Sequence, residues 1–168
     1  MPRLAIVLRS LFRGILSRWG KNRFENGVYI WRNGSFEKVS SCEELFKNPG
    51  SYIIYFHNNL CPHCRRFHPL FISTLETLGE ILGRAIIVRV VCDWFTSKCS
   101  DPDARKLFSE LRVAESPKLV YVKIDAGSVK KILDLSEDIS ILRSLERLRA
   151  ALLNLLREEA GVVESEGV

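Results

Sequence analysis

The chain has 168 residues, of which 46% are apolar, and a formal net charge of +5. This length suits one domain with a short extension, and the apolar fraction is enough to build a buried core. The charge is uneven, because residues 1–24 carry six basic and no acidic side chains, whereas residues 25–168 carry 19 basic and 20 acidic ones. A nucleic-acid-binding domain would carry basic charge on its folded body, so the composition argues against nucleic acid as a partner.

Residues 1–24 are expected to form a basic amphipathic, helical N-terminal extension. Placed on a helix, most of their apolar side chains gather on one side, with arginines opposite. Such a helix can pack on the domain or lie at a membrane surface, and an arginine-rich, acid-free start is also typical of organelle transit peptides. Arginines interrupt the apolar run that a secretory signal needs. We therefore expect a cytoplasmic protein, with peripheral attachment to a membrane as the alternative.

The first elements after the extension are predicted to be a β-hairpin and a short helix. Asn33-Gly34 is a strong hairpin signal between two short alternating runs, 27–30 and 36–39. Residues 41–44 have the form of a capping box, so a helix should begin there and end near residues 48–50.

The middle of the chain alternates between strand and helix signals. Residues 51–56 and 85–91 are β-branched and aromatic runs typical of buried strands. A helix from the CxxC at Cys61 to about Leu82 is expected between them. Asp101-Pro102, an N-cap followed by proline, predicts a further helix.

The C-terminal part predicts a second hairpin and a last helix. Lys118–Ile124 alternates as a strand does, and the turn at 125–128 leads into a strand over 129–133. Ser136 is expected to open the last helix, whose apolar stripe includes Ile139.

This order of elements predicts an α/β fold with a central mixed β-sheet flanked by helices on both faces. One domain over residues 25–160 is expected. Residues 161–168 are expected to form a frayed tail.

The chain contains five cysteines, so at least one lacks a partner within the chain: Cys42, Cys61, Cys64, Cys92 and Cys99. Cys61 and Cys64 form a CxxC run after a predicted buried strand and at a predicted helix start. Free N–H groups and the helix dipole favour a thiolate there, which makes Cys61 the candidate nucleophile in disulfide exchange. Cys64 is expected to resolve the mixed disulfide. The redox-active Cys61–Cys64 disulfide then needs no further cofactor.

Pro62 and His63 lie within this run and complete the set of candidate catalytic residues. Proline costs little at an early helical position, because its missing N–H would be unpaired there anyway. The His63 imidazole is expected to lower the pKa of Cys61. Because a stabilised reduced form makes a disulfide a stronger oxidant, the pair is predicted to favour giving disulfides to substrates.

Several motifs together resemble the thioredoxin-like superfamily over roughly residues 25–157. They are the strand run at 52–56, the sequence Cys61-Pro62-His63-Cys64, Pro69 eight residues after the first cysteine, and Ser116-Pro117 before a strand. The Cys-Pro-His-Cys sequence is similar to the active site of DsbA-type bacterial oxidases.

The resemblance implies the thioredoxin fold, with the active-site helix kinked at Pro69. It implies a thiol–disulfide oxidoreductase in which Pro117 is a cis-proline that faces the dithiol. Protein substrates are then expected to dock at Leu60, Ser116 and Pro117, with the substrate backbone beside Pro117 in the manner of an added strand.

Three features differ from the family pattern. The distance from Cys64 to Pro117 is too short for the helical insertion of DsbA-type proteins. Leu60 replaces a tryptophan, and Tyr55 replaces the buried acid that takes up the proton of the second cysteine. His57 is expected to point to the other face of the strand, so His57 and water both stay open as groups that assist Cys64.

Two other interpretations of Cys61 and Cys64 are open. They would be half of a zinc site if His57, His63 or His68 completed it, but a second CxxC or an HxxxH pair is missing, so no metal is expected. They would form a structural disulfide if the domain were a thioredoxin-like binding module.

Cys92 and Cys99 are candidates for a structural disulfide. Such a bond would close and rigidify a short loop, and the alternative is two buried small apolar side chains. Cys42 is expected to be a buried or free thiol without a function, and Trp94 is expected to serve in packing. The absence of glutamine and the single methionine favour a thermophilic source, and hyperthermophiles do keep intracellular disulfides.

The sequence therefore predicts an enzyme that exchanges disulfides with protein substrates. It would need a recycling redox partner, either a flavin-dependent reductase or a membrane oxidase. Arg65 and Arg66 would favour acidic substrates or simply form a solvated helix face. The alternative function is a non-catalytic adaptor, associated with a membrane surface, that binds a partner without turnover.

Overall fold

The computed structural model describes residues 23–159 and residue 161. Residues 1–22 of the predicted extension and most of the predicted tail lie outside this range. The described part contains one six-stranded sheet in the order β2-β1-β4-β3-β5-β6. Its strands are β1 (Gly27–Arg32), β2 (Ser35–Lys38), β3 (Gly50–Asn58), β4 (Ile86–Cys92), β5 (Lys118–Asp125) and β6 (Ser128–Asp134). The helices are α2 (Cys42–Phe46), α3 (Pro62–Leu78), α4 (Pro102–Glu110) and α5 (Leu145–Glu158).

The sheet is mixed, as the order of elements predicted. β3 and β4 are parallel neighbours joined through α3, while β1–β4, β3–β5 and both hairpins are antiparallel. Because the two central strands are parallel, their carboxyl ends meet at the same edge of the sheet. The segment that follows β3 therefore lies beside the one that follows β4, and Asn58 pairs with Cys92 in the register.

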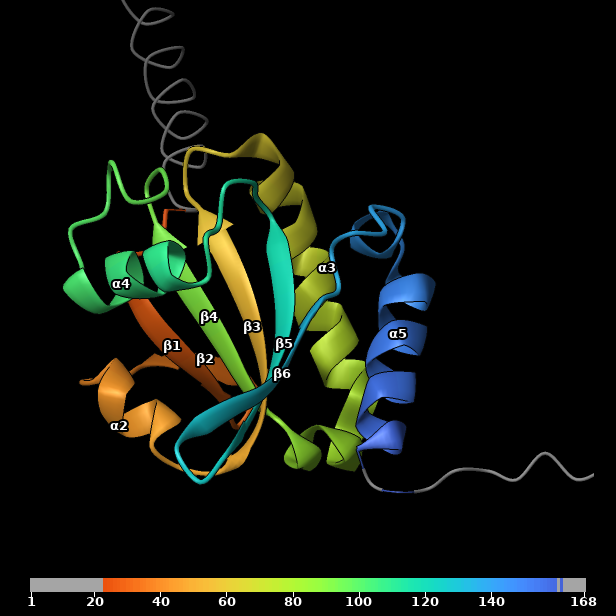
Figure 1. The fold of residues 1–168 in the computed structure, drawn as a ribbon. Coiled ribbons are helices and arrows are strands. Elements are labelled where there is room, and N and C mark those ends of the chain that lie inside the picture. Colours follow the sequence, from red (N-terminus) through yellow and green to blue (C-terminus); the bar gives the residue numbers. More distant parts are fainter. Residues whose placement is uncertain (1–22, 160, 162–168) are drawn as a thin grey trace, which may run out of the picture.

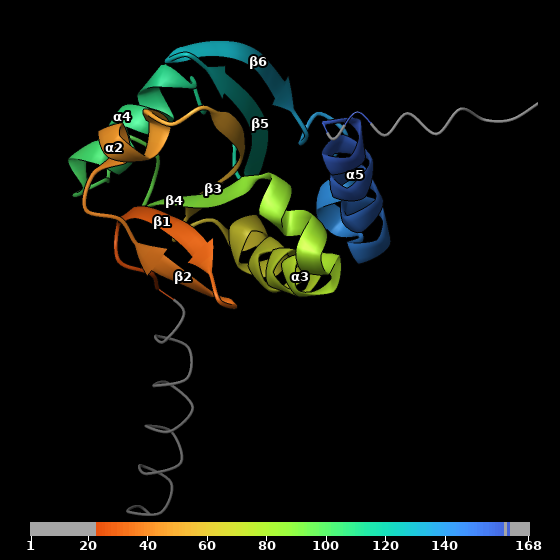
Figure 2. The same cartoon turned by 90° about the horizontal axis from the view of Figure 1, so that it is seen from below.

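Helices cover both faces of the sheet (Figures 1 and 2). Side chains alternate along β3, so Tyr52, Ile54 and Phe56 pack toward α2 and α4, whereas Ile53 and Tyr55 pack toward α3 and α5. This alternation divides the core into two apolar layers. The expectation of a mixed sheet flanked by helices is confirmed.

The last helix begins later than predicted. Ser144, not Ser136, is its N-cap, and its hydroxyl accepts a hydrogen bond from the Arg147 N–H. Ser136 is instead used in the bend after β6, where its backbone N–H donates to the Asp134 carboxylate. Ile139, which the prediction placed on the apolar stripe, is 57% exposed.

The active-site helix is also shorter than predicted. α3 ends at Leu78, because Gly79 adopts a positive φ of 56°, and a 3₁₀ helix over Gly79–Arg84 replaces the last turn. Pro69 lies inside α3. None of the helices in residues 23–159 combines the length and apolarity needed to cross a bilayer.

Candidate active site

Four segments meet at one end of the molecule, at the top of Figure 1. They are the end of β3, the start of α3, the loop after β4 and the loop that leads into β5. Cys61 is the N-cap of α3, and its backbone N–H donates to the Asn58 carbonyl at 3.0 Å. The Cys61 thiol lies 3.4 Å from the carbonyl oxygen of Ser116. The structure thus places the predicted dithiol against the predicted Ser116-Pro117 loop.

Cys61 is in a position that favours its thiolate. The residue is only 5% exposed, and this burial alone would raise the pKa of its thiol. The Ser116 hydroxyl and the backbone N–H groups of Cys64 and His63 oppose this effect, because they hydrogen-bond to the Cys61 sulfur. The net result is a Cys61 pKa below that of an ordinary cysteine.

The surroundings of Cys64 instead disfavour its thiolate. Its side chain has no exposed surface, and this burial raises its pKa to about 12. The backbone N–H of Asn58 donates to its sulfur at 3.4 Å and offsets part of that effect. The two thiols of one helical turn therefore differ in acidity, and Cys61 is the one that ionises more readily.

The other predicted site residues lie around the dithiol. Pro62 and His63 are exposed in the first turn of α3, and the group of His63 that reaches the Cys61 sulfur is its backbone N–H. The Ser116–Pro117 peptide bond is cis, and both of its residues are partly buried. Leu60 is 46% exposed.

A cavity of about 500 Å³ opens beside the dithiol. Phe67 and Leu70 of α3 supply apolar walls, and Pro117 lies at one side. Arg66 and Arg143 also line it, and in the described part of the chain neither of them forms an ion pair. Glu115 lines it as well, and its carboxylate pairs with Lys118 at 3.7 Å. The cavity therefore combines apolar walls with two unpaired arginines and one carboxylate that already has a basic partner.

The prediction that His57 points to the other face of the strand is wrong. Side chains alternate along a strand, so residues 55 and 57 share one face, and the Tyr55 hydroxyl lies 2.8 Å from Nδ1 of His57. The same hydroxyl donates to the Cys64 carbonyl at 3.3 Å. Tyr55 and His57 thus stand together behind Cys64, at the place where the family pattern has an acid.

A buried arginine next to this pair was missed by the sequence analysis. Arg89 is 5% exposed, and its guanidinium lies over the rings of Phe24, Tyr29 and Phe36 at 4.2, 4.9 and 4.3 Å from their centroids. Within residues 23–159 no carboxylate forms an ion pair with it. The available signal was a lone arginine in the apolar run of β4.

The cluster formed by His57, His68 and Arg89 carries one positive charge at neutral pH, that of Arg89. Burial lowers the Arg89 pKa to about 10, which leaves the guanidinium protonated at neutral pH. Burial, together with the nearby Arg89, lowers the pKa of His57 to about 3 and that of His68 to about 4. Both imidazoles are consequently neutral at physiological pH, and Arg89 is the fixed positive charge behind the dithiol.

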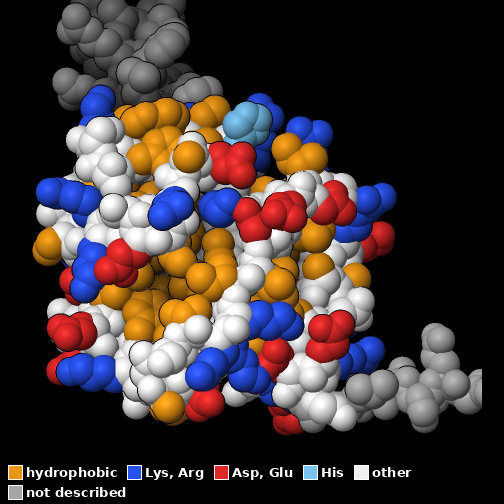
Figure 3. Space-filling view, viewed as in Figure 1, with side chains coloured by type: hydrophobic (Ala, Val, Ile, Leu, Met, Phe, Trp, Pro, Cys, Tyr) orange, Lys and Arg blue, Asp and Glu red, His pale blue; other side chains and the backbone are white. Residues whose placement is uncertain are grey.

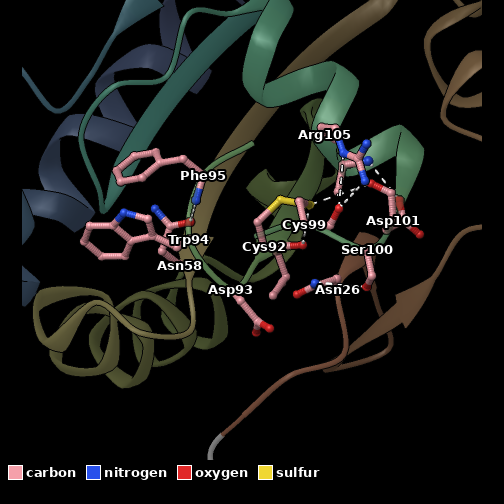
Figure 4. The surroundings of a disulfide bond; sticks show 12 residues. Asn26, Asn58, Cys92, Asp93, Trp94, Phe95, Cys99, Ser100, Asp101 and Arg105 are labelled. Carbon is pink, nitrogen blue, oxygen red and sulfur yellow. Dashed lines mark hydrogen bonds between the residues drawn. A yellow bond between two sulfur atoms is a disulfide. The ribbon is translucent and has the colours of Figure 1, made fainter. Parts of the chain in front are cut away.

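Cys92 and Cys99 form a disulfide that closes the loop after β4 (Figure 4). This confirms the disulfide over the alternative of two separate thiols. Cys42 is a free, buried thiol whose pKa burial raises to about 12. No group of three or more His, Cys, Asp or Glu side chains in residues 23–159 is placed to hold a metal ion.

Trp94 in the disulfide loop is not a core residue. It is 41% exposed, because the closed loop projects from the end of β4. Apolar side chains gather at this end of the molecule, at the top of Figure 3. The loop and Leu60 are joined by a hydrogen bond from the Leu60 N–H to the Asp93 carbonyl, so both belong to the surroundings of Cys61.

No protein-family model and no curated protein sequence matches this chain. Its structure resembles the first thioredoxin domain of mouse protein disulfide-isomerase A4, with 16% identity, 76% of this chain and 79% of that chain covered, and a TM-score of 0.51. The J-Trx1 fragment of ERdj5 matches with 18% identity, 72% and 50% coverage and a TM-score of 0.52. Human ERp44 matches with 16% identity, 70% and 28% coverage and a TM-score of 0.51. The chain thus spans half of the ERdj5 fragment and less of ERp44. These likenesses show that the chain has a thioredoxin-like fold.

Proposed function

We propose that this chain is a protein thiol–disulfide oxidoreductase with Cys61 as nucleophile and Cys64 as resolving thiol. The observation that carries this proposal is the inequality of the two thiols. Cys61 has a lowered pKa and contacts Ser116, which lines the cavity, whereas the pKa of Cys64, three residues later, is about 12. A structural disulfide would need no such difference, whereas sequential exchange requires one thiolate to attack first.

The reaction proceeds in two exchange steps. The Cys61 thiolate attacks a substrate disulfide, a bond forms between its sulfur and one substrate sulfur, and the other substrate sulfur leaves as a thiolate. Cys64, once deprotonated, then attacks the Cys61 sulfur and releases the second substrate sulfur. Two electrons pass from the dithiol to the substrate, and the reverse sequence gives a disulfide to a substrate dithiol.

The proton of Cys64 needs an acceptor in the second step. In the described residues no carboxylate contacts Cys64, and His57, with a pKa of about 3, is too weak a base to keep that proton at neutral pH. A leaving cysteine thiolate has a pKa of about 8.5 and is the stronger base. We assign proton uptake to the leaving sulfur of the substrate.

The surroundings of Cys61 support a direction of exchange and a docking site for substrate. A lowered pKa stabilises the reduced form, which favours disulfide donation, as the DsbA-like Cys-Pro-His-Cys sequence also suggests. Substrate backbone would dock beside Pro117, with a neighbouring side chain in the adjacent cavity. A separate redox partner would then return the dithiol to its starting state.

The test combines turnover with trapping. Cys61→Ser should abolish exchange with a disulfide-bonded peptide, while Cys64→Ser should accumulate a mixed disulfide on Cys61, visible by mass spectrometry. Equilibration with glutathione should give a potential nearer to about −120 mV than to about −270 mV. A chain that binds peptides equally well without either cysteine, and never exchanges, would instead be a binding module.

A further inference from the structure

Asn58 connects every segment of the candidate site. It is the last residue of β3 and has no exposed surface. Its backbone N–H donates to the Cys64 sulfur at 3.4 Å, and its carbonyl accepts from the Cys61 N–H at 3.0 Å. Its side chain reaches two other segments, the loop that carries Ser116 and the loop that carries Phe95. One buried amide thus bridges both loops that flank the dithiol.

The orientation of this amide is fixed by its partners. The Phe95 backbone N–H can only donate, and it lies 2.7 Å from Oδ1 of Asn58. The amide nitrogen must then face the other way, where Nδ2 donates to the Ser116 hydroxyl oxygen at 2.9 Å. Because that oxygen already accepts a hydrogen bond, the hydroxyl proton of Ser116 is free to point elsewhere. The sulfurs of Cys61 and Cys64 are both within its reach, and a hydrogen bond from Ser116 lowers the pKa of each thiol. Of the two, Cys61 is the one whose pKa is lowered overall, so its thiolate is the charged acceptor.

The Phe95 N–H is itself held by the disulfide-closed loop. Cys92 and Cys99 tie the ends of the loop, and paired hydrogen bonds between the backbones of Trp94 and Lys98 close it further. Figure 4 shows Asn58 turned toward Phe95, at the side of the loop away from the disulfide. A chain of contacts therefore runs from the disulfide loop through Asn58 and Ser116 to Cys61.

We propose that Asn58 is a positioning residue, which, oriented by the disulfide-closed loop, aims the Ser116 hydroxyl at the Cys61 thiolate. The inference deepens the proposed function, on which it rests, by naming the groups that keep the nucleophile ionised. It also gives the second disulfide a role at the site in addition to closing its own loop. Reduction or loss of the Cys92–Cys99 bond frees the Phe95 N–H and lets the Asn58 amide rotate.

The test is the pH dependence of Cys61 alkylation by iodoacetamide, which needs no protein substrate. In a Cys42→Ser background, Asn58→Ala should move the midpoint of the rate profile to higher pH. Below that midpoint the rate should fall about tenfold, the loss expected for one hydrogen bond to a charged group. Ser116→Ala should have the same effect. The double variant should be no slower than Ser116→Ala alone, because both changes act through one hydroxyl.

Two further variants separate orientation from packing. Asn58→Asp keeps the acceptor for Phe95 but takes the Ser116 proton for itself, so it should raise the midpoint at least as far as Asn58→Ala does. Replacing Cys92 and Cys99 by alanine should raise the midpoint in the same direction. The matched control is Asn26→Ala, since Asn26 is another buried asparagine that donates to a serine hydroxyl, Ser100, but does not contact the dithiol.

The outcomes are distinct. An unchanged midpoint in Asn58→Ala, or additive effects of Asn58→Ala and Ser116→Ala, would overturn the proposal. An unchanged midpoint in the Cys92/Cys99 variant would overturn the part assigned to the loop. If Asn58→Ala does not fold, Asn58→Asp and Ser116→Ala carry the comparison. A chain that shows these shifts but never exchanges disulfides would refute the proposed function and leave the positioning role standing.

Discussion

The Tyr55 hydroxyl lies 2.8 Å from Nδ1 of His57, on the face of β3 that packs against α3. The phenol also donates to the Cys64 carbonyl, so the pair contacts the resolving cysteine through its backbone. Arg89, the nearby fixed charge, is positive. The interior behind this dithiol therefore holds two neutral rings and a cation in place of an acid, and the predictions below depend on that arrangement.

The inequality of the thiols predicts selective labelling. At pH 7 a small excess of iodoacetamide should modify Cys61 alone in the reduced protein. Burial raises the pKa of both Cys64 and Cys42 to about 12, which leaves almost no thiolate at either. Peptide mapping by mass spectrometry measures the result. Labelling in urea, where all three thiols should react, is the control, and comparable rates at Cys61 and Cys64 in the native protein would contradict the assignment.

The buried histidines predict a loss of stability in mild acid. The pKa of His57 is about 3 in the folded chain, against about 6.5 when unfolded, so between these values the unfolded chain binds a proton that the native chain excludes. The free energy of unfolding should therefore fall as the pH falls below about 6.5, by about 2 kcal/mol from His57 at pH 5. His68, with a pKa of about 4, acts in the same direction.

Urea unfolding at pH 7 and pH 5 measures this effect. His57→Asn keeps an N–H donor for the Tyr55 hydroxyl oxygen but cannot titrate, so its loss of stability between the two pH values should be about 2 kcal/mol smaller. His63→Asn, at an exposed position, is the control. An identical pH dependence in the wild type and His57→Asn would show that the native chain admits the proton.

The Cys92–Cys99 disulfide predicts a limited contribution to stability. Its cysteines are seven residues apart, and closing so short a loop stabilises the folded state by about 2.5 kcal/mol through the entropy of the unfolded chain. Replacing both cysteines by alanine should lower the free energy of unfolding by about that amount. Chemical denaturation, with Cys42→Ala as a comparison that forms no disulfide, tests the estimate, and a loss near zero would contradict it.

The cavity beside the dithiol predicts a preference for acidic substrates. Arg66→Glu or Arg143→Glu should reduce kcat/KM for a disulfide peptide with a neighbouring carboxylate by about tenfold, and much less for its neutral analogue. Arg65→Glu is the matched control, because Arg65 is exposed on the same helix but does not line the cavity. Equal losses in Arg65→Glu and Arg66→Glu would point to long-range charge in place of a local contact.

Much of the fold could be predicted because its signals are local. The Asn33-Gly34 turn, the Asp101-Pro102 helix start and the apolar strands all have structures that their own residues favour. Ser136 was misjudged because the competing interaction, with Asp134 at the end of β6, depends on a tertiary bend. The dithiol was recognised by its spacing. Arg89 was not, because its aromatic surroundings come from segments that are distant in sequence.

The position of Cys61 at the N-cap of α3 has a consequence for the two redox forms of the protein. A thiolate accepts hydrogen bonds from the first-turn N–H groups and offsets the positive end of the helix dipole, whereas a disulfide sulfur is uncharged. The longest helix of the described chain is therefore capped more strongly when the dithiol is reduced. Folding and reduction are linked in a thermodynamic cycle. If the reduced protein melts at a higher temperature than the oxidised one, folding favours reduction of the Cys61–Cys64 disulfide, and the protein is an oxidant. Two melting curves, recorded without any substrate, would then report the direction in which this dithiol drives electrons.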